Sequence, residues 1–163
     1  VAWGWLEPIG TRMLCLSTTA ALEHLTASFA VQSLEDGRID AMDPPMRDMM
    51  RWHAAEEIEH RDVAFDVMQA MGGGWLVRVL GMAIALVGLV GFWLYLWWHL
   101  SRQVPALTWR RTLADRREVF EKGWGHGFVV RDALRYLRPG FHPRHDAVDH
   151  LVPAALEGLG ETA

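Results

Sequence analysis

A chain of 163 residues is long enough to bury a hydrophobic core, and we expect one domain or part of one. Its net charge of −4 at pH 7 indicates no excess of basic residues for binding a phosphate backbone, so we expect no nucleic-acid partner. One cysteine against eight histidines excludes an internal disulfide framework, fits a reducing compartment and directs any metal site towards nitrogen and oxygen ligands. Nine tryptophans indicate a membrane interface or a large aromatic core.

Helical spacing of apolar residues predicts an all-α fold, and no stretch shows the alternation of a strand. One helix is predicted from Thr11 to about Leu34, ended by Gly37. A second is predicted from about Met46 to Ala70, ended by the glycines at 72–74. Two long helices joined by a short loop form an αα-hairpin.

The second helix carries two histidines and three glutamates within positions 53–60. On a helix, His53, Glu57 and His60 lie at i, i+4 and i+7 and share one face. Glu23 projects from a stripe of small residues on the first helix, and we expect it to meet that face across the hairpin. Glutamate opposite Glu-x-x-His is half of a carboxylate-bridged two-metal site. We therefore predict Glu23, His53, Glu57 and His60 as ligands of a divalent metal, with iron or manganese favoured over zinc.

Two neighbouring carboxylates are candidates for proton transfer. Glu56 and Glu59 are expected at the flanks of the ligand face, where they pair with Arg51 or Arg61 or hold a ligand imidazole by its second N–H. In a hydrolytic site, either carboxylate could take the proton of a metal-activated water, which makes them the predicted catalytic residues. His24 points about 100° away from Glu23 round the helix, and we expect it in the core or as a support for a ligand.

Residues Leu80 to Trp98 form a run of nineteen positions without a charged side chain, which meets the length rule for a transmembrane helix. Aromatic residues gather at its end as in an interfacial belt: Trp93, Tyr95, Trp97 and Trp98. Two interpretations stay open, a bundle helix buried on all sides and a helix that contacts a membrane. The chain is accordingly expected in the cytoplasm or associated with the inner membrane.

These patterns divide the chain into three segments. Residues 1–74 form the metal-ligand helical hairpin, and residues 75–104 form the apolar helix, buried or membrane-associated. Residues 105–163 hold the C-terminal helices and a turn. Within this last segment, helix is expected from Thr108 to about Leu137, interrupted at Gly123–Gly127.

Three stretches resemble a bacterial family called predicted metal-dependent hydrolases. They are residues 20–27 (AALEHLTA), residues 52–60 (WHAAEEIEH) running into residues 63–66 (VAFD), and residues 138–143 (RPGFHP). The resemblance covers roughly Thr11 to Pro143. It implies a ferritin-like helical bundle, present here as its C-terminal half plus the apolar helix. It also implies metal-dependent hydrolysis of a small-molecule substrate, which the sequence does not identify.

The His-x-x-x-Glu-x-x-His pattern is also similar to di-iron enzymes of the p-aminobenzoate N-oxygenase type, in which an extra histidine joins the site. A di-iron oxygenase or oxidase that activates O₂ is therefore an alternative, and a non-enzymatic, membrane-associated helical module is a third. Members of the hydrolase family are longer at the N-terminus, where further helices supply the opposite half of the site. We favour a fragment whose missing N-terminal half precedes Val1; a symmetric homodimer is the other way to complete the site.

Overall fold

The computed structural model describes residues 12–104, 110, 127–157 and 159. Over these residues the chain forms helices and no strand, which confirms the all-α prediction; the ferritin-like arrangement stays a prediction. The elements are α2 (Arg12–Glu35), η1 (Ile39–Ala41), α3 (Pro44–His60), α4 (Val63–Ala70), α5 (Trp75–Ser101), α7 (Gly127–Tyr136), η2 (Pro143–His145) and α8 (Leu151–Leu156). Most of the helix expected from Thr108, with its break, lies outside the described residues.

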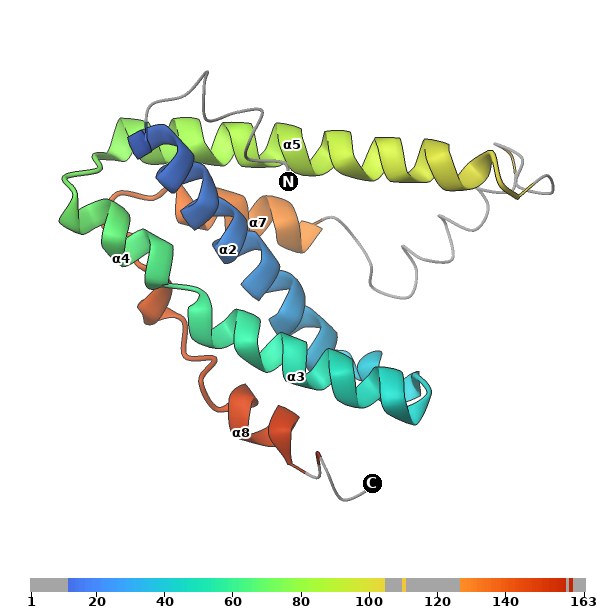
Figure 1. The fold of residues 1–163 in the computed structure, drawn as a ribbon. Helices are drawn as coiled ribbons and strands as arrows, with labels where there is room; N and C mark the ends of the chain where they lie inside the picture. Colours follow the sequence, from blue (N-terminus) through green and yellow to red (C-terminus); the bar gives the residue numbers. More distant parts are fainter. Residues whose placement is uncertain (1–11, 105–109, 111–126, 158, 160–163) are drawn as a thin grey trace.

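Helix α2 is the central element, with α5 packed on one side and α3 and α4 on the other (Figure 1). Its predicted extent agrees with the structure, and Gly37, with a φ of 69°, takes the left-handed conformation that ends many helices. Small side chains on α2, such as Ala20 and Ala21, are fully buried and allow its neighbours to approach closely. The predicted αα-hairpin is formed by α2 and α3, with Ile39 and Ile58 in its core.

The single helix predicted from Met46 to Ala70 is wrong, because the structure divides it into α3 and α4 at Arg61 and Asp62. The Arg61 side chain is buried, donates to the Ile58 carbonyl oxygen at 2.6 Å and pairs with Asp149 at 2.7 Å. Asp62 pairs with Arg144 at 2.6 Å. Both contacts tie the junction to the C-terminal part of the chain, so long-range ion pairs stabilise the break.

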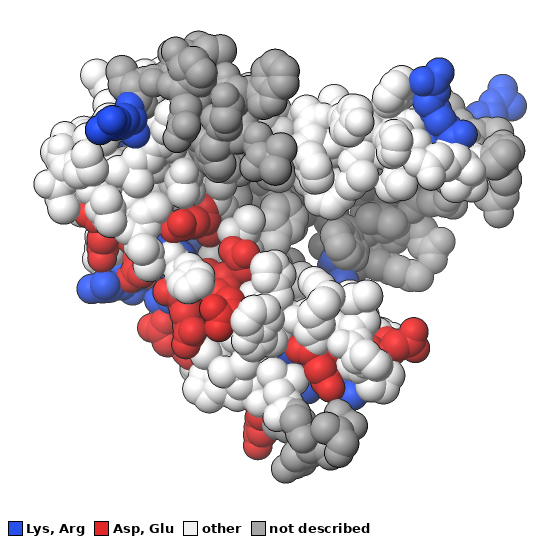
Figure 2. Space-filling model, in the orientation of Figure 1, with Lys and Arg blue, Asp and Glu red and all other residues white. Residues whose placement is uncertain are grey.

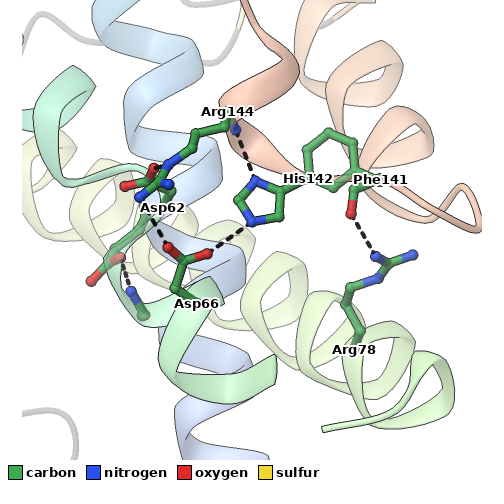
Figure 3. A network of polar contacts seen from close by, with 8 residues as sticks. Asp62, Asp66, Arg78, Phe141, His142 and Arg144 are labelled. Atoms are coloured by element: carbon green, nitrogen blue, oxygen red, sulfur yellow. Dashed lines mark hydrogen bonds and ion pairs between the residues drawn. The ribbon is translucent and has the colours of Figure 1, made fainter. Parts of the chain in front are cut away.

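A turn after α7 fastens the C-terminal segment to α4 and α5 (Figure 3). The Arg78 guanidinium on α5 donates to the Arg138 and Phe141 carbonyl oxygens at 2.6 and 3.2 Å. His142 Nδ1 accepts the Arg144 backbone N–H at 3.1 Å, so its Nε2 carries the proton and donates to Asp66 at 2.8 Å. These contacts give the turn a structural role, since they join α4 and α5 to the C-terminal segment.

Helix α5 is buried only near its beginning, so an all-round-buried bundle helix is the wrong interpretation. Its buried residues are Arg78, Gly81, Met82 and Ala85. The second half projects past the other described helices (Figure 1). By length and composition α5 could cross a membrane, with a mean hydropathy of 2.3 over a window of which 17% is buried.

Candidate metal centre

Glu23 lies where α2 passes the beginning of α4. Its Oε2 accepts the backbone N–H of Ala64 at 3.1 Å. Ala64 is the second residue of α4, and the first amides of a helix have no partner within the helix. The break between α3 and α4 therefore creates a donor for this carboxylate, and the positive end of the α4 dipole favours its charge.

Other charged groups surround Glu23. Burial raises the pKa of Glu23, the Ala64 amide and His60 lower it, and the negative charges of Glu57 and Asp62 raise it again. These influences place Glu23, Glu57, His60 and Asp62 in one electrostatic neighbourhood at the seam of α2, α3 and α4. A crowd of carboxylates is costly unless a cation accompanies it.

The predicted ligand face of α3 points partly to solvent. His53 Nε2 lies 3.6 Å from Glu57 Oε1, and His60 Nε2 lies 3.7 Å from Glu56 Oε2. Both distances exceed a hydrogen bond, so each pair is loosely associated. The side chain of Glu57 is 26% exposed and that of His60 is 63% exposed. Glu57 thus lies at the boundary between the packed seam and the solvent.

The two predicted catalytic carboxylates differ in placement. Glu56 lies beside His60, as expected for a group that holds a ligand imidazole. Glu59 is exposed and lies two positions beyond Glu57, about 200° round the helix. The expected pairing of these carboxylates with Arg51 or Arg61 is not what forms: the two arginines pair with Asp40 and Asp149.

An apolar groove of about 200 Å³ adjoins the ligand face between α2 and α3. His53 and Glu57 line one part of it, and Phe29, Ala30 and Met50 are among its apolar walls. Carboxylate and imidazole donors therefore share a surface with an apolar recess large enough for a short chain or a ring.

A family model described as "Predicted metal-dependent hydrolase" matches residues 3–147. The chain belongs to this family. The match includes Glu23, the whole of α3 and the RPGFHP turn, which agrees with the resemblance of these stretches. No curated protein and no solved structure matches the chain.

A metal-dependent family implies a metal, and the donor types of the seam fit one. Carboxylates and imidazoles suit iron, manganese or zinc, and the Glu23 carboxylate, whose pKa is raised chiefly by burial and further by the charges of Glu57 and Asp62, would be neutralised by a bound cation. Among the described residues, however, no three such side chains converge closely enough to hold an ion. The seam therefore provides donors for part of a coordination shell.

Sequence reasoning missed Asp62 and the Ala64 amide. Asp62 occupies the N-cap position of α4, a place that aspartate favours. That preference was the available signal, but a run without glycine or proline gave no reason to divide the helix there. His24 follows its prediction: it is buried and donates to the Asp132 carbonyl oxygen at 3.1 Å, and burial lowers its pKa.

The variant Glu23→Gln is expected to be more stable than the wild type near neutral pH when both proteins are free of metal. Because the pKa of Glu23 is raised in the folded chain, the free energy of unfolding falls as pH rises from the unfolded to the folded pKa. Glutamine removes this cost and can still accept the Ala64 N–H. We expect the Tm to rise by about 2 °C at pH 7.5, with solvent screening keeping the gain small.

Thermal unfolding with a chelator present, at pH 4 and pH 7.5, measures this effect. Glu59→Gln, in an exposed carboxylate of α3, is the matched control and should leave the Tm unchanged. A lower Tm for Glu23→Gln at pH 7.5 would contradict the destabilising role of the Glu23 charge.

Proposed function

We propose that the chain provides one half of the active site of a metal-dependent hydrolase, at the seam of α2, α3 and α4. The observation that carries the proposal is the Glu23 carboxylate, held by the Ala64 amide in the same electrostatic neighbourhood as Glu57 and His60. Glu23, Glu57 and His60 would hold the metal, with His53 as a further donor. Iron or manganese is favoured by the carboxylate and imidazole donors, and zinc is the alternative.

A bound divalent ion would supply Lewis acidity and lower the pKa of a coordinated water. The chain's own groups have separate tasks. The Ala64 amide fixes the orientation of Glu23, and Glu56 lies beside His60, where it can hold the imidazole and accept a proton from the attacking water. Glu59 is exposed and lies farther round the helix from Glu57 than Glu56 does, so we assign the base to Glu56.

The groove between α2 and α3 would hold the apolar part of the substrate. Its walls are mainly apolar, and it meets the ligand face at His53 and Glu57. A molecule with a short alkyl or aryl group next to its scissile bond would place that bond near the carboxylates. We propose such a compound as the substrate class.

The seam holds only part of a shell, so we propose that a helical segment preceding Val1, or a second copy of the chain, supplies the remaining ligands. The same donors suit a di-iron oxygenase or oxidase, and this is the second candidate function, since the carboxylate-rich, thiolate-free set favours iron. Metal content and oxygen consumption separate the two.

Hydrolysis of a panel of p-nitrophenyl acyl esters and phosphate esters tests the proposal, with metal-loaded and chelated protein compared. We expect turnover only with metal. The variant Glu56→Gln should lower kcat by about 100-fold or more while the metal content is unchanged, as loss of a general base does.

Glu59→Gln is the matched control, because it removes a neighbouring carboxylate of α3 that is more exposed and lies farther round the helix from Glu57; its kcat should equal that of the wild type. Equal losses in both variants would overturn the assignment of the base. Oxygen consumption by the iron-loaded protein without ester hydrolysis would favour the oxidative alternative.

A further inference from the structure

Helix α5 carries an exposed apolar stripe along its whole length. The stripe is formed by Leu76, Leu80, Val87, Val90, Leu94 and Trp98, with exposed fractions of 70, 55, 75, 56, 62 and 47%. At 1.5 Å per residue it is about 33 Å long. The helical turn of about 100° per residue places it opposite the buried face formed by Arg78, Gly81, Met82 and Ala85.

This stripe is a large apolar surface in contact with water. Soluble monomers rarely expose continuous apolar patches of more than a few hundred Å², so such a surface indicates a partner. The packed face of α5 is occupied by α2, and the stripe therefore faces away from the described body.

We propose that α5 lies in the surface of an anionic lipid bilayer, with the stripe buried at the boundary between headgroups and acyl chains. The exposure of the second half of α5 favours lipid over a protein groove. Six consecutive residues, Val90 to Tyr95, are all exposed, so this half of α5 is apolar on every side. A protein groove would cover only one face of such a helix, whereas at a bilayer surface acyl chains cover the stripe and the headgroup region accommodates the flanking aromatic residues.

The ends of the stripe carry the side chains that membrane interfaces favour. Trp98, the last residue of the stripe, is exposed; Trp75, at the other end of α5, is also exposed, although its indole N–H donates to the Leu137 carbonyl oxygen at 2.8 Å. The Arg102 guanidinium lies 4.6 Å from the Trp98 ring, and Arg102 and Arg110 are exposed beyond the last turn. Indole rings sit at headgroup level, and arginines there attract anionic headgroups.

The charge distribution of the molecule also fits contact between α5 and an anionic bilayer. Helix α5 contains no acidic residue, whereas acidic side chains gather over α3 and α4 (Figure 2). Bilayer contact through α5 would therefore leave the acidic surface and the candidate metal centre on the far side of α2, in water (Figure 1).

Flotation with vesicles tests the proposal. We expect the full chain to float with phosphatidylcholine–phosphatidylglycerol vesicles at low salt and to bind pure phosphatidylcholine vesicles roughly 5-fold less for each arginine involved. The double variant Val87→Glu with Leu94→Glu should lower the partition coefficient by about 100-fold or more, because two apolar side chains no longer enter the boundary.

The matched control is Met49→Glu with Val67→Glu, which changes two exposed apolar residues on α3 and α4. It should float like the wild type, and circular dichroism should show equal helix content in all three proteins. Wild-type protein that stays unbound, or a stripe variant that floats equally well, would overturn the proposal. Equal binding to neutral vesicles would overturn the choice of anionic lipid.

Light scattering in vesicle-free buffer tests the alternative that a second copy of the chain covers the stripe. A wild-type dimer that the stripe variant converts to a monomer, without flotation of the wild type, would show that α5 pairs with a second copy and would overturn the proposal.

Discussion

The Glu57→Ala variant is expected to lose bound metal, with an apparent affinity at least about 100-fold below that of the wild type. Glu57 is the one carboxylate among the predicted ligands of α3, and it lies within the electrostatic neighbourhood of Glu23 and on the same face as His53 and His60. Its removal leaves imidazoles without the carboxylate that joins them to α2. Elemental analysis of protein from iron- and manganese-supplemented cultures, followed by competition with a chelator, measures the loss.

The matched control is Glu59→Ala, which removes an exposed carboxylate from the same helix on another side. It should keep the wild-type metal content, and with a chelator present both variants should unfold at a Tm near that of the metal-free wild type. Equal metal in Glu57→Ala and the wild type would contradict the ligand assignment. A Tm lowered only in Glu57→Ala would instead point to a structural role.

The Gly81→Ala variant is expected to lose about 3 kcal/mol of stability, close to the upper end for overpacking. A Cβ atom at Gly81 would lie 2.6 Å from the Ser17 carbonyl carbon on α2. This neighbour is helical backbone and cannot rotate away. The two helices are also fixed here by the Ser17 hydroxyl, which donates to the Val77 carbonyl oxygen at 2.9 Å. Thermal unfolding should show a Tm lower by roughly 6–12 °C.

Gly88→Ala is the control on the same helix, because a Cβ atom there meets nothing within 4 Å. Alanine is the better helix former by up to about 1 kcal/mol, so this variant should be as stable as the wild type or slightly more stable. Equal destabilisation by both substitutions would contradict the account, because the loss could then not come from the contact between α2 and α5 at Gly81.

The hairpin of α2 and α3 and the shared face of His53, Glu57 and His60 could be predicted because local signals determine them. Gly37 ends α2 in a conformation that glycine favours, and the side-chain face follows from helical periodicity. The apolar character of α5 was equally plain. Which of its faces packs against α2 depends on Gly81, whose partner Ser17 lies 64 positions earlier in the chain.

The division between α3 and α4 could not be predicted, since its causes are distant in sequence. Arg61 pairs with Asp149 and Asp62 with Arg144, both from the C-terminal segment. The Ala64 amide that binds Glu23 becomes available only through this division. The sequence thus indicated the ligand candidates, whereas the group that orients Glu23 depends on tertiary contacts.

Anomalous diffraction from crystals grown with manganese tests the central claim most directly. The account predicts a manganese peak at the seam of α2, α3 and α4, with oxygen of Glu23 or Glu57 and nitrogen of His60 at about 2.0–2.3 Å, the usual range for such ligands. A peak bound by other residues, or no peak from a protein that retains manganese in solution, would contradict it.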